Sequence, residues 1–328
     1  MTDTLFDKAY GCLLGLAIGD ALGAPVEGWS AGQISETHGW VDDFLTDAPV
    51  GTDDTEFAIL TARNLIQYGE KITPEDVERE WRKLIDTRQF FGGGFSEAAA
   101  IRNLKMGLST PLTGRNNPEM WSDGTAMRIA PVGIFCAGDP AKAAGLALID
   151  GMISHAGDGL FAAQAVAASV AVAAVSSSWD EVVQAGLRYI PHDSWTYRLI
   201  ERAILLADAC TSLQEAARRL HDEISVHQYY WVDVGPEAVA LAYGAIVAGK
   251  GNYRDSVVCA VNCGRDADTI AAIAGAITGA YQGIAGIPES WISRINPVRG
   301  KCIVPLAGTD IKSVAEELVA KIHLEQRL

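Results

Sequence analysis

Two long apolar segments built mostly from small residues limit what this chain can fold into. They read FAAQAVAASVAVAAVSSS from position 161 and TIAAIAGAITGAYQGIAGI from position 269. A membrane-spanning helix needs roughly 20 strongly apolar residues, whereas these segments are dominated by alanine, glycine and threonine. We therefore predict two buried central helices, whose repeated small side chains let neighbouring backbones approach closely.

Helical periodicity continues through the rest of the chain, with short polar breaks. Alternating strand patterns are nearly absent, and KCIVPL at 301–306 is the one modest candidate for a strand. No linker, low-complexity tract or repeat divides the sequence, so we predict an all-α fold in a single domain, 1–328. The expected helices span 4–22, 53–68, 74–86, 95–106, 125–136, 140–154, 158–176, 179–187, 195–208, 212–222, 235–249, 252–263, 268–283, 288–294 and 310–323.

Charge and cysteine usage exclude several classes of protein. The formal net charge of −15 opposes binding to a phosphate backbone, which depends on lysine and arginine, so we expect no nucleic-acid partner. Six cysteines lack CxxC pairs and zinc-like histidine spacing, which is typical of reduced thiols. The first residues lack the basic region and cleavage site of a signal peptide. We predict a cytoplasmic protein without a membrane partner.

Two acidic motifs have the same residue pattern. GTDDTEFAIL at 51–60 and CGRDADTIAA at 263–272 each place glycine, two closely spaced aspartates and a threonine before an apolar helix. A helix N-terminus favours negative charge, so capping is one interpretation of each motif. Capping needs only one aspartate, however. It does not explain why Asp53 accompanies Asp54, or why Asp266 accompanies Asp268.

A hard divalent cation explains the pairs better. Mg²⁺ and Mn²⁺ prefer oxygen ligands in octahedral geometry, and two such ions a few Å apart need bridging carboxylates with hydroxyl or water ligands. The two motifs lie more than 200 residues apart, so their convergence is an inference. GLAIGDALGAPVEGWS at 15–30 adds Glu27 in a loop after a glycine-rich helix end. On its own, Glu27 is also explained as a solvated surface residue.

Several motifs together resemble the ADP-ribosylglycohydrolase family. They are GDALGAPVE, TDDT, DGTAMRIAPVG, SHAGD, GRDADTIAAIAGAITGA and IPESW, in this order from 19 to 291. The resemblance implies a compact orthogonal bundle of helices, two Mg²⁺ or Mn²⁺ ions at the base of a cleft, and ADP-ribose or an ADP-ribosylated acceptor as the partner. Carried over by position, the implied metal ligands are Glu27, Thr52, Asp53, Asp54, Asp266, Asp268 and Thr269.

Three departures from the family pattern concern the substrate. RQFFGGGFSEAAAIRN at 88–103 has glycines where branches specific for arginine-linked ADP-ribose place an aspartate, and it resembles the O-glycosidic, serine-type branch. The amides of Gly92, Gly93 and Gly94 would approach a ligand closely, or the loop is a flexible turn. The family's GNG is Ser122-Asp123-Gly124 here, and Arg265 replaces a glycine, which we expect to add positive charge beside the metals.

Aromatic and histidine side chains complete the candidate binding residues. Phe95 and Trp121 are candidates for a stacking face against adenine, although either is also explained as a core residue. His155 in SHAGD matches a position that contacts the nucleotide end of the ligand in relatives, or it caps a helix.

Cleavage of a ribosyl bond passes through an oxocarbenium-like state, which needs oriented sugar hydroxyls and an activated water. We predict Glu27 and Asp54 as catalytic residues, with Glu27 as the proton-transfer group. The expected function is metal-dependent hydrolysis of the bond between ADP-ribose and an acceptor. Two alternatives stay open: a riboside or nucleoside-type hydrolase with the same binuclear site, and a non-enzymatic, crystallin-like relative.

Overall fold

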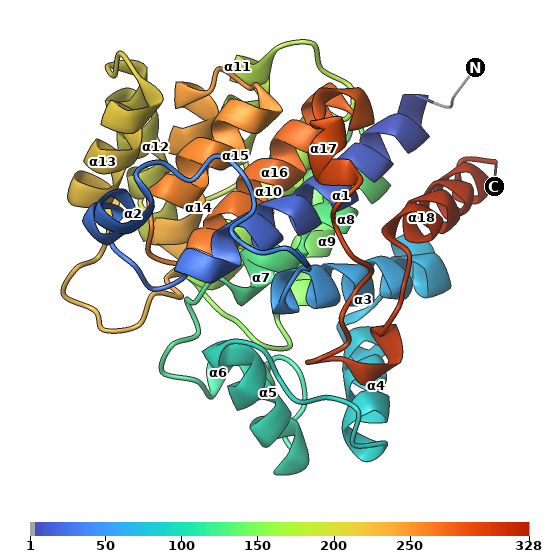
Figure 1. Cartoon of the computed structure of the whole chain (residues 1–328). Helices are drawn as coiled ribbons and strands as arrows, with labels where there is room; N and C mark the ends of the chain where they lie inside the picture. The colour runs from blue at the N-terminus through green and yellow to red at the C-terminus, as the bar shows by residue number, and fades with distance from the viewer. Residues whose placement is uncertain (1–3, 328) are drawn as a thin grey trace.

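The computed structural model describes residues 4–327, and in that range it contains 18 α-helices and no sheet. The all-α prediction is therefore confirmed. The central pair is α1 (Thr4–Gly23) and α16 (Ala267–Gln282), which lie side by side in the middle of Figure 1 and share the most extensive helix contact in the molecule. Thr4–Val26 has the length and hydropathy of a membrane span, but 83% of its most apolar stretch is buried inside the protein.

A glycine stripe explains how closely these two helices pack. Helix α1 has glycines at 11, 15, 19 and 23, and they face the α16 backbone at 279, 275, 271 and 267. A Cβ atom at any of the four would lie 2.2–2.5 Å from a carbonyl oxygen of α16. The two helices run antiparallel, so the C-terminal end of α1 meets the N-terminal end of α16. This contact brings Asp20 close to the second acidic motif.

The other helices surround the central pair. The second predicted central helix is α10 (Asp158–Ala173), most of whose residues are buried, and it packs against α16. The remaining helices are α2 (Ala31–His38), α3 (Asp53–Tyr68), α4 (Pro74–Asp86), α5 (Phe95–Lys105), α6 (Leu112–Arg115), α7 (Gly124–Arg128), α8 (Ala130–Phe135), α9 (Pro140–Gly151), α11 (Trp179–Arg188), α12 (Trp195–Asp208), α13 (Leu213–Ile224), α14 (Gly235–Ala248), α15 (Tyr253–Asn262), α17 (Glu289–Ile292) and α18 (Ile311–Glu325).

Three local expectations differ from the structure. Helices α2 and α6 were not predicted, although α2 begins with a capping box between Ser30 and Gln33. The expected helix 125–136 is divided into α7 and α8 around Ile129, because Pro131 cannot donate the backbone hydrogen bond that would continue it. KCIVPL does not form a strand: it makes one bridge, between Phe90 and Ile303, and then turns at Val304–Leu306.

Candidate functional site

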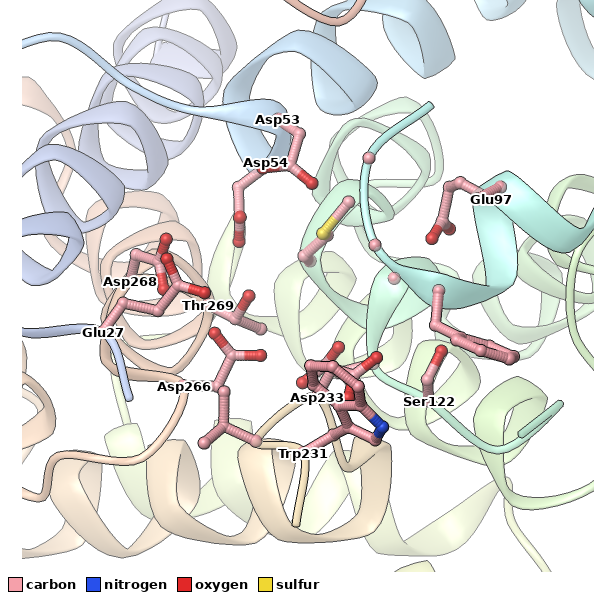
Figure 2. Close-up of a pocket in the computed structure, with 18 residues that line it drawn as sticks. Glu27, Asp53, Asp54, Glu97, Ser122, Trp231, Asp233, Asp266, Asp268 and Thr269 are labelled. Carbon is pink, nitrogen blue, oxygen red and sulfur yellow. The ribbon is translucent and has the colours of Figure 1, made fainter. Parts of the chain in front are cut away.

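Carboxylates from three helices and one loop meet where α1, α3 and α16 approach each other. One oxygen from each of Asp20, Asp54 and Asp268 lies within 4.8 Å of the other two, and the same holds for Glu27, Asp266 and Asp268. Figure 2 shows Glu27, Asp54, Asp266 and Asp268 facing a common space. The structure thus brings together the two acidic motifs that lie more than 200 residues apart in the sequence.

Asp20, and not one of the paired aspartates, caps the start of α3. Its Oδ2 accepts hydrogen bonds from the amides of Thr52, at 2.7 Å, and Thr55, at 3.1 Å, and from the Thr55 hydroxyl, at 2.5 Å. Thr52 precedes α3 and makes no side-chain cap bond, and neither does Asp266 at the start of α16. Helix capping therefore does not account for the paired aspartates.

Glu27 reaches the cluster from the loop after a short 3₁₀ turn (Ala24–Val26). The Gly28 amide donates to the Arg265 carbonyl at 2.8 Å, and the Arg265 amide donates to the Trp29 carbonyl at 2.7 Å. These bonds hold the Glu27 loop against the start of α16. Glu27 is the most exposed carboxylate of the cluster, so it is the one with the best access to solvent water.

Burial and mutual repulsion raise the pKa values of the clustered acids. Burial is the main cause at Asp54, Asp266 and Asp268, whose pKa values lie well above the ordinary range. Burial also raises the pKa of Asp20 to about 7, against the opposing effect of its hydrogen bonds. The pKa of Glu27 is raised by burial and then by Asp53. The negative charges of these carboxylates are therefore poorly compensated by the protein without a bound cation.

The donor set fits a divalent cation. Asp20, Asp54 and Asp268 each keep one buried Oδ1 atom without a hydrogen-bond partner. An unpartnered buried carboxylate oxygen is costly, and hard cations such as Mg²⁺ and Mn²⁺ bind such oxygens. Thr269 lines the adjoining cavity, while the Thr52 hydroxyl lies 3.4 Å from Asp54 Oδ2. The predicted ligands Thr52, Asp53, Asp54, Asp266, Asp268 and Thr269 therefore lie at or beside the cluster, as does Glu27.

A cavity of about 350 Å³ opens beside this cluster. Six predicted substrate-binding residues line it: Gly93, Gly94, Phe95, Ser122, Asp123 and Gly124. Eight carboxylates line it as well, namely Glu27, Asp53, Asp54, Glu97, Asp123, Asp233, Asp266 and Asp268, and no lysine, arginine or histidine of the described residues does so. Figure 2 places Glu97 and Ser122 across the cavity from Glu27 and Asp268.

Gly93 makes room for Asp53. A Cβ atom on Gly93 would lie 2.6 Å from Asp53 Oδ2 and 2.8 Å from the Phe57 ring. Gly94 has more space, because the nearest atom to an added Cβ would be Glu97 Oε2 at 3.4 Å. A substitution at Gly93 would therefore displace a candidate metal ligand, and Gly94 is the better position for testing the loop.

Four predicted residues do not line the cavity: Thr52, Gly92, Trp121 and His155. Trp121 packs edge-on against Trp195 and Tyr229. His155 is buried behind Ser122, with Nε2 3.0 Å from the Ser122 hydroxyl, and burial lowers its pKa well below the usual value. Direct ligand contacts by these residues stay predictions.

Three carboxylates and one aromatic residue of the site were not predicted from the sequence, namely Asp20, Glu97, Asp233 and Trp231. Asp20 had a signal, since it is a carboxylate in the buried, otherwise apolar stretch from Gly11 to Gly23 of α1. Glu97 is fully buried, bonds Arg128 at 2.8 Å, and has its pKa raised by burial to about 7. Burial also raises the pKa of Asp233 to about 6.

The expectation for Arg265 was wrong in one respect. Its guanidinium is directed to Glu237, with Nε 2.6 Å from Oε1, and this ion pair neutralises it. Arg265 therefore does not add an uncompensated positive charge beside the acidic cluster.

Comparisons with known proteins agree with this fold. The family model described as ADP-ribosylglycohydrolase matches residues 1–327. An uncharacterized protein of Archaeoglobus fulgidus is 34% identical, with 97% of this chain and 96% of the relative covered. The ADP-ribosylarginine hydrolase Tri1 of Pseudomonas putida is 24% identical, with 88% of this chain and 74% of the relative covered.

A solved structure supports the same assignment at the level of the fold. A chain of an ADP-ribosylglycohydrolase-related protein complex superposes with a TM-score of 0.70 at 24% identity, covering 97% of this chain and 99% of that chain. With a family model that matches nearly every residue, the chain belongs to the ADP-ribosylglycohydrolases, hydrolases that act on the glycosidic bonds of ADP-ribose.

Proposed function

We propose that this protein is a divalent-metal hydrolase that cleaves the bond between ADP-ribose and an acceptor. The observation that carries the proposal is that Asp20, Asp54 and Asp268 each place one oxygen within 4.8 Å of the others beside the cavity, and that each keeps a buried oxygen without a hydrogen-bond partner. We propose two Mg²⁺ or Mn²⁺ ions, because the two triads of carboxylates share Asp268 and otherwise use different residues. The family membership and the complete acid set both favour an enzyme over a crystallin-like protein.

The chain's own residues have defined tasks in this reaction. Asp20, Asp54 and Asp268 would hold one ion, and Glu27, Asp266 and Asp268 would hold the other. The bound ions would supply positive charge that orients the ribose hydroxyls and a water. Glu27, the exposed carboxylate, accepts the proton of the attacking water. Without metal, burial and Asp53 raise the pKa of Glu27. A nearby cation would lower this pKa, so that Glu27 stays ionised and can accept the proton. Asp54 is buried beside Asp20 and Asp268, and in this proposal it is the carboxylate of α3 that holds the metal against the ribose.

We propose an O-linked acceptor, on the basis of the glycine loop. Gly93 and Gly94 line the cavity at the position where arginine-specific branches have an aspartate. Arginine linkage is the competing outcome, because two relatives are named ADP-ribosylarginine hydrolases and because Glu97 and Asp233 place carboxylates nearby. The test compares ADP-ribose release from serine-linked and arginine-linked peptides of matched sequence. Faster release from the serine-linked peptide supports the proposal, and faster release from the arginine-linked peptide refutes it.

One observation favours a second candidate, a riboside hydrolase. The cavity lining includes eight carboxylates and, among the described residues, no cationic side chain that would meet a diphosphate. Calorimetric titration in Mn²⁺ separates the two candidates. If the loop amides bind the diphosphate, ADP-ribose should bind at least about 10-fold more tightly than ribose, since each charge-assisted hydrogen bond contributes roughly 1.5–3 kcal/mol. Equal affinities would favour the riboside hydrolase. A cytoplasmic location stays a prediction.

A further inference from the structure

Arg265 has a backbone conformation that normally selects glycine. Its φ is 62°, and among the described residues only Arg88 and Lys250 are other non-glycine residues with positive φ. Such a conformation persists in a larger residue only where the surroundings hold it in place. Gly264, the residue before it, also has positive φ and pairs with Ser30 in an isolated bridge.

The guanidinium of Arg265 binds a segment that lines the cavity. Besides its ion pair with Glu237, Nη2 donates to the Trp231 carbonyl at 3.2 Å and to the Val226 carbonyl at 3.4 Å. Glu237 is 1% exposed and also accepts a hydrogen bond from the Val226 amide. The ion pair is thus enclosed. Arg265 binds the carbonyl of Val226 and Glu237 binds its amide, so both members of the pair hold the same segment.

This wall segment, residues 225–234, connects α13 to α14. Trp231, Val232 and Asp233 line the cavity, and Trp231 has 55% of its surface exposed. Figure 2 shows Trp231 and Asp233 between the acidic cluster and Ser122. Two further contacts hold the rest of the segment: the Tyr229 hydroxyl donates to Glu119, and Asp233 accepts from the Phe95 amide at the start of α5.

We propose that Arg265 is a positioning residue that fixes the wall segment, so that Trp231 and Asp233 form a preorganised side of the substrate cavity. Its backbone holds the Glu27 loop and its side chain holds the wall, so one residue sets the distance between the two. The substrate would then meet Trp231 in place, without having to order a mobile loop on binding. This inference rests on the proposed function only where it concerns turnover.

The test uses a double variant, Arg265→Gly with Glu237→Gln. Glycine suits the positive φ, and glutamine can still accept from Val226 without leaving a buried charge unpaired. We expect KM to rise about 10-fold, because the segment must then be ordered on binding, while kcat stays within about threefold of the wild type. Amide hydrogen exchange in 225–234 should become faster, and Mn²⁺ affinity should stay unchanged.

Two comparison variants separate positioning from general destabilisation. Lys250→Gly relieves the same kind of backbone conformation, φ 51°, at a residue outside the cavity lining, and should leave KM and exchange in the wall segment unchanged. Arg265→Lys keeps the charge opposite Glu237 but lacks the planar fork, and should give an intermediate KM.

Unchanged KM and unchanged exchange in the double variant would overturn the proposal. Weaker Mn²⁺ binding together with a lower kcat would also overturn it, since Arg265 would then support the acidic cluster instead. If the wild type cleaves no ADP-ribosyl substrate, the proposed function fails, and the exchange measurement still decides the role of Arg265.

Discussion

Asp20 stands in an unusual place for a carboxylate, inside a helix whose neighbouring residues are almost all apolar and buried. One of its oxygens caps α3, and the other has no partner. A single aspartate therefore links the packing of α1 on α3 to the acidic cluster, which also contains Asp54 and Asp268. The protein without metal should consequently respond to pH through these residues.

The first prediction concerns the stability of the metal-free protein. Folding raises the pKa of Asp20 from 3.8 to about 7, and raises those of Asp54 and Asp268 as well. The folded protein then binds more protons than the unfolded chain, so the free energy of unfolding must fall as pH rises through this range. In EDTA, Tm should decrease from about pH 5 to about pH 8. A Tm that increases over this range would contradict the assignment of these shifts.

The second prediction concerns Asp268, the carboxylate shared by both triads. Asp268→Asn removes one buried negative charge, so we expect a higher Tm than wild type in EDTA at pH 8. The variant should also lose the Tm increase of about 5 °C or more that saturating Mn²⁺ gives the wild type. Asp47→Asn, at an exposed position, is the matched control and should behave as wild type in both conditions. Full Mn²⁺ stabilisation of Asp268→Asn would place the metal elsewhere.

The third prediction isolates proton transfer at Glu27. Glu27→Gln keeps the side-chain shape but cannot accept a proton, so kcat should fall by roughly 10² to 10⁴. ADP-ribose binding in Mn²⁺, measured by calorimetry, should change little, because glutamine keeps a side-chain oxygen that can ligate the ion. Turnover close to that of the wild type would remove Glu27 from the catalytic role.

At the scale of helices, the contact of α1 with α16 holds the cluster in shape. Gly15 is four residues from Gly19 on the contact face, and a Cβ there would lie 2.5 Å from the Gly275 carbonyl and 2.9 Å from the Tyr253 ring. Gly15→Ala should therefore lower the free energy of unfolding by about 3 kcal/mol in urea denaturation. Gly145→Ala, in α9 with no atom within 4 Å of the added Cβ, should raise it by up to about 1 kcal/mol. Equal effects at the two positions would refute the close-contact account.

The sequence indicated most helices because their periodicity is local, and it failed where geometry depends on distant residues. The capping box of α2 was readable from Ser30 and Gln33, and Pro131 marked the break after α7. Asp20 was different: its role follows from the distance between α1 and α3, which no spacing reveals. Glu97 and Asp233 also look like ordinary helix or loop acids until the fold encloses them.

At the scale of the whole molecule, the site collects residues from position 20 to position 269. Helix α1 packs on α18 as well as on α16, so the first and last helices lie close together, at the right of Figure 1. This closure supports our proposal of a single domain. The acidic motifs converge only because the outer helices bring the chain back to α1. Their spacing in the sequence could not reveal this convergence.

The most direct test of the account is the release of free ADP-ribose from a serine-linked ADP-ribosylated peptide, followed by mass spectrometry. Wild type should release ADP-ribose in Mg²⁺ or Mn²⁺ and stop in excess EDTA. Restored metal should restore wild-type activity, while Asp268→Asn should stay inactive. Release that continues unchanged in EDTA, or no release from either serine-linked or arginine-linked peptides with metal present, would contradict a metal-dependent ADP-ribosyl hydrolase.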